Sequence, residues 1–195
     1  MVRFMTRSLI LVVFLLLGAV TEALAASPPP NDNRDSAQSV GALPVAVGGT
    51  TVGATVEIKE APSGCARTGG SVWYAISFGS SPPGAVGVRV QANGDLDAAV
   101  DVFQRQRSQN IPVVCARTDQ NGVADTTFQP SPNATYLIRV AERANSTSGT
   151  FSLKTFVVPP PPSPPGTGLP PHGGHGTPDS SFNGPDALSL HLQAG

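Results

Sequence analysis

Apolar and polar side chains alternate with a period of two through much of this sequence, most clearly in residues 71–78. There Val72, Tyr74 and Ile76 share one side of the chain with Phe78. A period of two is typical of a β-strand with one buried face. Similar stretches lie before and after this one, so we expect residues 71–78 to form the centre of a β-sandwich core.

Turn residues separate these alternating stretches. Gly48-Gly49 and Pro82-Pro83-Gly84 predict turns, Asn93-Gly94 predicts a tight hairpin, and residues 35–40 predict one helical turn. The pattern predicts an all-β fold, a jelly-roll-like sandwich of about eight antiparallel strands. The other expected strand segments are residues 45–47, 50–52, 86–91, 96–103, 111–116, 125–128, 136–141 and 151–157.

The N-terminus has the features of a signal peptide, which we assign to residues 1–25. Arg3 and Arg7 precede an apolar run from Leu9 to Val20, and Ala23-Leu24-Ala25 offers a cleavage site. We therefore expect a secreted, extracellular chain; a periplasmic or cell-surface location is the alternative. An uncleaved membrane anchor is a second interpretation, but the apolar run is shorter than the about 20 residues that span a bilayer.

Composition limits the classes of partner. The net charge is −1 and only 13% of residues are charged, so the chain as a whole has no field that attracts nucleic acid or an anionic membrane. We expect no nucleic-acid partner, and no stable membrane insertion after signal removal. With 21 Gly and 20 Pro, the chain suits a turn-rich extracellular β-domain.

The two cysteines, Cys65 and Cys115, are an even count in an exported chain, which favours a disulfide. Closing the intervening loop would restrict the unfolded chain by about 4 kcal/mol in the entropy model. Two separate thiols are the alternative.

The composition changes after the last expected strand. Residues 158–185 are rich in Pro and Gly and predict a disordered, extended linker. Within it, His172 and His175 could hold a metal ion weakly, but a solvated linker is the simpler interpretation. Residues 186–195 alternate like a strand, and they are either the first strand of a second, missing module or an unstructured apolar tail.

Several motifs together resemble the bacterial pre-peptidase C-terminal (PPC-like) domain family over residues 31–157. These motifs are Asn31-Asp32-Asn33, Gly49-Thr50-Thr51-Val52-Gly53, Ser71-Val72-Trp73-Tyr74, Asn93-Gly94-Asp95-Leu96-Asp97, Val100-Asp101-Val102-Phe103, Thr135-Tyr136-Leu137-Ile138-Arg139-Val140 and Gly149-Thr150-Phe151-Ser152-Leu153. The resemblance implies a non-catalytic jelly-roll sandwich of the kind that accompanies exported enzymes. Some members of the family bind calcium, collagen or polysaccharide.

The resemblance also implies candidate calcium ligands. Asn31 and Asp32 match the Asn-Asp dipeptide of the calcium-binding members. Those members place an acidic pair immediately before the dipeptide, where this chain has residues 28–30, all proline. Calcium takes six to eight oxygen ligands, so this end of the domain supplies an incomplete set.

The sequence does not favour an enzyme. All three histidines follow residue 165, outside the predicted domain, and a Ser–His or Cys–His system needs its base packed beside the nucleophile. The spacing of Asp95, Asp97 and Asp101 would place three carboxylates on one strand face. They could do acid–base work or bind a cation, but the solvated face of a strand is the simpler interpretation.

An exposed aromatic side chain could bind a polymer. Trp73 lies on the strand face opposite Tyr74, and either Trp73 or Phe103 could be a flat platform for a sugar; burial in the core is the alternative. We therefore expect a non-catalytic module that binds an extracellular polymer or protein surface, or presents a separate catalytic module. A carbohydrate or matrix binder with weak calcium dependence is the second hypothesis, and a hydrolase is the third.

Overall fold

The computed structural model describes residues 26–162, except residue 108. The predicted signal peptide, linker residues 163–185 and the strand-like segment 186–195 lie outside this part of the chain. The chain divides into the units Met1–Pro160 and Pro161–Gly195, and the sandwich belongs to the first. In the described residues, no helix is long and apolar enough to cross a membrane.

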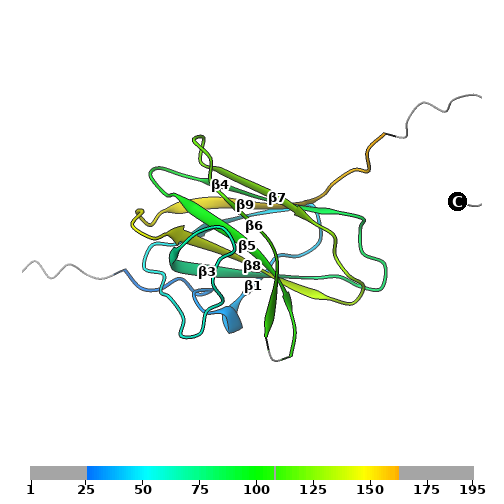
Figure 1. The fold of residues 1–195 in the computed structure, drawn as a ribbon, viewed down its shortest axis with the longest axis horizontal. Helices are drawn as coiled ribbons and strands as arrows, with labels where there is room; N and C mark the ends of the chain where they lie inside the picture. Colours follow the sequence, from blue (N-terminus) through cyan, green and yellow to red (C-terminus); the bar gives the residue numbers. More distant parts are fainter. Residues whose placement is uncertain (1–25, 108, 163–195) are drawn as a thin grey trace, which may run out of the picture. The chain divides into compact units, whose positions relative to one another are not determined.

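The predicted all-β sandwich is confirmed, with nine strands in the described residues (Figure 1). The elements are a short 3-10 helix η1 (Arg34–Ser36), then β1 (Gln38–Ser39), β2 (Val45–Thr50), β3 (Thr68–Ser77), β4 (Val86–Ala92), β5 (Ala98–Arg105), β6 (Asn110–Arg117), β7 (Val123–Phe128), β8 (Thr135–Arg143) and β9 (Thr150–Val157). The expected helical turn at residues 35–40 is therefore η1 followed by β1, an additional strand.

The strands form a five-stranded sheet, in the order β1-β3-β8-β5-β6, and a four-stranded sheet, in the order β2-β9-β4-β7. Figure 1 shows β4, β9 and β7 above β3, β8 and β1. The pairings are antiparallel, except that the two-residue β1 runs parallel to β3. Most successive strands lie in opposite sheets, and only β5 and β6 are consecutive neighbours in one sheet.

Two sequence motifs predicted to form turns have other roles in the structure. Gly48-Gly49 is not a turn, because both residues lie inside β2 and pair with β9. A Cβ atom on Gly49 would overlap the Tyr74 hydroxyl and the ring of Phe151, so a close approach of these rings requires glycine there. The Asn93-Gly94 turn does not close a hairpin either, because β4 and β5 belong to different sheets.

The main core lies between the sheets and uses the alternating residues that the pattern identifies. Val72, Tyr74 and Ile76 are buried, and Phe78 packs against the core edge-on to Phe128 and Tyr136. Burial of each large apolar side chain stabilises the fold by about 1.5–3 kcal/mol. The strand predicted to be central therefore contributes a buried face to the core, as expected.

A second buried layer covers the outer face of the five-stranded sheet. Its centre is a row across three neighbouring strands, with Trp73 of β3 opposite Arg139 of β8, and Arg139 opposite Asp101 of β5. Arg139 has no exposed side-chain surface. Its Nη2 and Nε donate to Asp101 Oδ2 at 2.8 and 3.3 Å, and its guanidinium carbon lies 5.5 and 5.2 Å from the ring centroids of Trp73 and Phe103.

The long loop between β2 and β3 covers this row. Arg139 Nη1 donates to Glu60 Oε1 at 2.7 Å and to the Ala61 carbonyl at 2.6 Å. Asp101 Oδ1 accepts hydrogen bonds from Ser63 Oγ at 2.8 Å and from the Gly64 N–H at 3.2 Å. The loop is therefore bound to the sheet through the two charged groups that are buried beneath it.

The predicted disulfide between Cys65 and Cys115 is confirmed, with the two Cα atoms 6.1 Å apart. Cys115 of β6 lies opposite Asp101 in the sheet, so the bond extends the same row by one strand. It closes a segment with a sequence separation of 50. The disulfide and the Arg139 contacts thus hold the same loop against the same sheet face.

We predict that Arg139→Met lowers the free energy of unfolding by about 3–5 kcal/mol, because Asp101 and Glu60 then remain buried without their counter-charge. Arg89→Met is the matched control. It removes an arginine whose ion pair with Asp125 is solvent-exposed, so its effect should stay within about 1 kcal/mol. Urea unfolding measures both variants, and equal losses would contradict a special role for Arg139.

Candidate functional site

The two outer faces of the sandwich differ in what covers them. The β2–β3 loop and the N-terminal segment pack on the five-stranded sheet, where Ala37 and Ala61 adjoin the buried Trp73, Phe103 and Leu137. The outer face of the four-stranded sheet carries polar, exposed side chains, among them Arg89, Gln91, Asp125, Thr127 and Lys154. The open face of the four-stranded sheet is therefore the candidate binding surface.

Trp73 does not form the exposed platform that the sequence suggested, and this interpretation is corrected. Its side chain is on the outer face, as predicted, but only 1% of its surface is exposed. The ring packs 5.9 Å from the Phe103 ring, centroid to centroid, beneath the β2–β3 loop. Phe103 is buried in the same layer, so neither aromatic offers a flat face to a ligand.

The aromatic side chain on the open face is Phe156 of β9. It lies directly opposite Gly87 of β4, and its ring lies across the position that a Gly87 Cβ would occupy. Gly87 is buried as a result, whereas Phe156 remains partly exposed. Because Gly87 has no side chain, the Phe156 ring can pack flat against the sheet surface at this position.

Charged groups lie beside this ring. Arg89 pairs across the strands with Lys154 on one side and Asp125 on the other, and its Nε donates to Asp125 Oδ2 at 2.9 Å. A shallow groove of about 450 Å³ adjoins Arg89, Lys154 and Phe156, and Pro44, Val45 and Ala46 line its other side. The face therefore combines one apolar ring with hydrogen-bond donors and a partly neutralised positive charge.

Asn31 binds the N-terminal segment to β3, and Asp32 binds it to the β2–β3 loop. Asn31 Nδ2 donates to the Trp73 carbonyl at 3.0 Å, and the Trp73 N–H donates to the Asn31 carbonyl at 2.9 Å. Both Asp32 oxygens accept hydrogen bonds from Thr55, at 2.6 Å from its N–H and 2.7 Å from its hydroxyl. Burial raises the pKa of the neighbouring Tyr74 phenol, against a smaller lowering by a hydrogen bond with Asn31.

The three carboxylates proposed from their spacing do not form one solvated row. Asp95 and Asp97 precede β5, and Asp101 is buried with Arg139 rather than solvated. Asp97 pairs with Arg143 and accepts a hydrogen bond from the Thr118 hydroxyl at 2.8 Å. The interpretation as a solvated strand face is wrong for Asp101, because Arg139 and the covering loop bury it.

A broad hollow of about 730 Å³ at one end of the domain includes Asp97, Arg143 and the turn between β6 and β7. In that turn, Asp119 Oδ1 accepts hydrogen bonds from the Val123 N–H at 2.9 Å and the Asn121 N–H at 2.8 Å. These bonds lower the pKa of Asp119 below its ordinary 3.8. The Asp97 and Asp119 carboxylates thus already satisfy groups of the protein itself.

Comparisons with known proteins concern the fold. No family model and no curated protein matches the chain. Among solved structures, it is similar to the pre-peptidase C-terminal domain of collagenase from Bacillus anthracis, with 15% identity, a TM-score of 0.44, and coverage of 67% of this chain and 99% of that chain. This is the family whose motifs the sequence resembles.

Two further solved structures are similar to the chain. One is CorA, a surface-associated copper-binding protein of Methylomicrobium album BG8, with 9% identity, a TM-score of 0.42, and coverage of 63% of this chain and 98% of that chain. The other is the periplasmic lysozyme inhibitor PliG of Aeromonas hydrophila, with 16% identity, a TM-score of 0.36, and coverage of 61% and 95%. At these values the likeness is one of fold alone.

Sequence reasoning missed Phe156 as a candidate site residue. The alternation places it on the outer face with Lys154, but nothing in the order of residues shows that Gly87 lies opposite. The register between β4 and β9 supplies that information. An outward aromatic residue in one strand and an outward glycine in another are a signal only after the two strands are paired.

We predict that Asp119 contributes stability that depends on pH. A carboxylate with a lowered pKa stabilises the fold above its unfolded pKa of 3.8, and this contribution is lost as the pH falls through the lower, folded pKa. The difference in free energy of unfolding between the parent and Asp119→Ala should be constant above about pH 5 and shrink towards about pH 2.

Urea unfolding across this pH range checks the prediction. Asp95→Ala serves as the control, since Asp95 is another exposed aspartate in the same hollow. A parent–variant difference that stays constant down to the lowest pH would contradict the role assigned to the Asp119 carboxylate.

Proposed function

We propose that this chain is an exported, non-catalytic β-sandwich module that binds an extracellular polymer through the open face of its four-stranded sheet. The proposal rests on one observation: the Phe156 ring packs over Gly87, among exposed polar side chains of β4, β7 and β9. The Cys65–Cys115 disulfide supports the location, because such bonds persist in oxidising, extracellular compartments.

The shape of this face favours an extended ligand over a small molecule. Small-molecule sites are concave and enclose most of the ligand's surface, whereas this face is an open sheet with a shallow groove beside Phe156. A polymer can lay an apolar sugar or proline face on the ring and hydrogen-bond to Arg89, Lys154 and Gln91, which follow the ring along β4 and β9. A protein surface is a second ligand of the same extended kind.

An accessory role beside a separate catalytic module fits the same geometry. The domain's carboxylates at Asp97 and Asp101 already pair with Arg143 and Arg139, which supports a non-catalytic module over a hydrolase. The alternative of weak calcium dependence rests on Asn31 and Asp32. Because Thr55 uses both Asp32 oxygens, a calcium ion there would have to share or displace these hydrogen bonds.

We predict that retention of the protein on an insoluble polymer depends on Phe156. Cellulose, chitin, collagen and peptidoglycan are tested, each with and without EDTA. On the polymer that retains the parent protein, Phe156→Ala should weaken binding at least about tenfold, since it removes the burial of one aromatic side chain. Phe156→Trp should retain binding, because the larger ring can occupy the same position.

Two further variants sharpen this test. Gly87→Ala keeps Phe156 but displaces its ring from the sheet, so binding should weaken while the aromatic residue is still present. Arg117→Ala changes an exposed arginine of the five-stranded sheet and should bind like the parent. Full retention by a folded Phe156→Ala variant would refute this site. Hydrolysis of any polymer would refute the non-catalytic assignment, and loss of retention in EDTA would favour the calcium-dependent alternative.

A further inference from the structure

The β2–β3 loop exposes apolar side chains at several positions. Val52 is 40% exposed, Val56 60% and Ile58 92%. A branched apolar residue with nearly its whole surface in water stabilises nothing in the domain itself. Single exposed apolar residues are ordinary, so the significance of Ile58 depends on how the loop holds it and on what surrounds it.

Hydrogen bonds to the body of the domain fix the loop on both sides of Ile58. On one side, Asp32 binds the backbone and the hydroxyl of Thr55. The Glu57 carboxylate accepts a hydrogen bond from the Arg34 N–H, which ties the loop to η1. On the other side, Glu60 Oε1 binds the buried Arg139. Ile58 is thus at the tip of a tied loop, and the fold holds it in the solvent.

Basic side chains continue from this tip through η1 to the turn between β5 and β6. Arg34 lies on η1 beside Glu57, and its Nε is 3.6 Å from Asp35 Oδ1. The same Asp35 oxygen is 3.9 Å from Arg105 Nη2 at the end of β5, and Arg107 lines a small cavity with both arginines. We call Val56, Ile58, Arg34, Lys59, Arg105 and Arg107 the basic tip.

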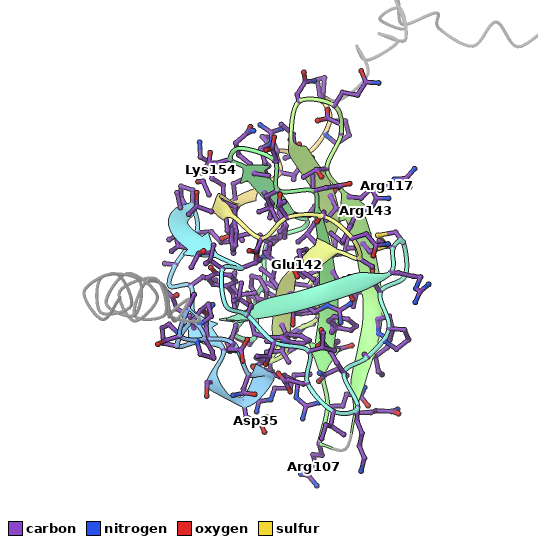
Figure 2. All side chains as sticks on the ribbon, turned by 90° about the vertical axis from the view of Figure 1, so that its left-hand side faces the viewer. Asp35, Arg107, Arg117, Glu142, Arg143 and Lys154 are labelled. Atoms are coloured by element: carbon purple, nitrogen blue, oxygen red, sulfur yellow. A yellow bond between two sulfur atoms is a disulfide. The ribbon has the colours of Figure 1, made fainter. Side chains whose placement is uncertain are left out.

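The charges of the chain are therefore unevenly placed. The net charge of the whole chain is −1, whereas the basic tip has four cationic side chains beside the carboxylates of Asp35 and Glu57. Figure 2 shows Asp35 and Arg107 at the bottom of the view, with Lys154 of the open face far above them. The basic tip and the proposed polymer-binding face are thus separate surfaces.

We propose that the basic tip docks the domain peripherally on an anionic lipid surface, with Ile58 and Val56 entering the boundary between headgroups and acyl chains. Apolar residues with Lys and Arg nearby suit such an interface, where the apolar side chains leave water and the cations remain among the phosphates. A projecting tip would need a matching cavity in a protein partner, whereas a lipid interface deforms around it. The docking involves no transmembrane segment.

Vesicle co-sedimentation tests this proposal with the full chain purified after export, whose N-terminus is established by intact mass. Vesicles of phosphatidylcholine alone are compared with vesicles that also contain phosphatidylglycerol. We expect binding only with phosphatidylglycerol, and weaker binding at high salt. Ile58→Ser should lower the partition coefficient about tenfold, and Lys59→Gln and Arg107→Gln about fivefold each.

Two matched controls carry the same chemical changes elsewhere. Val157→Ser alters another exposed apolar residue, at the end of β9, and Arg117→Gln another exposed arginine, at the end of β6. Both should bind like the parent. Ile58→Ala shortens the apolar side chain without adding a hydroxyl group, so its partition coefficient should fall between those of Ile58→Ser and the parent. Thermal unfolding confirms that each variant is folded.

Three results would overturn the proposal. Equal binding to both kinds of vesicle would show that the basic side chains do not contribute to binding. Unchanged binding of folded Ile58→Ser would show that the apolar side chain does not contribute. Full competition by a soluble polyanion such as heparin, combined with no effect of Ile58→Ser, would assign the basic tip to an anionic macromolecule instead of a membrane. Because Phe156 lies outside the basic tip, these results are independent of the polymer-binding test.

Discussion

The buried guanidinium of Arg139 is the interaction on which the arrangement of this domain depends. It joins three strands of one sheet to the loop above them, through Asp101 on one side and Glu60 with the Ala61 carbonyl on the other. A buried ion pair is weak evidence for added stability, since desolvation offsets much of the attraction. Its clearer effect is geometrical, because every donor that points at the loop requires a partner there.

This covering explains why the two outer faces differ in exposure. With the β2–β3 loop, the disulfide and the N-terminal segment on the five-stranded sheet, the aromatic Trp73 is part of the interior. The four-stranded sheet keeps its outer face open, and Phe156 rests there on Gly87. The same loop, held by Glu60 and Thr55, projects Ile58 away from the domain. One set of buried contacts therefore covers one sheet face and positions the projecting loop.

The alternation of side chains was sufficient to predict the sandwich and its inner layer. Val72, Tyr74 and Ile76 are buried because a period of two records which side faces the partner sheet. It does not record what covers the other side, so it leaves Trp73 open between platform and core and places Asp101 on a solvated face. The contact between Phe156 and Gly87 could not be predicted for a related reason, because it depends on the register between β4 and β9.

We propose that the covered sheet supports the fold and that the open sheet binds the ligand. Hydrogen exchange on the polymer-bound protein, measured by mass spectrometry, tests it directly. We expect added protection in peptides that cover β4, β7 and β9, and unchanged exchange in the β2–β3 loop around residues 60–65. Protection confined to that loop, with no change in the four-stranded sheet, would contradict it.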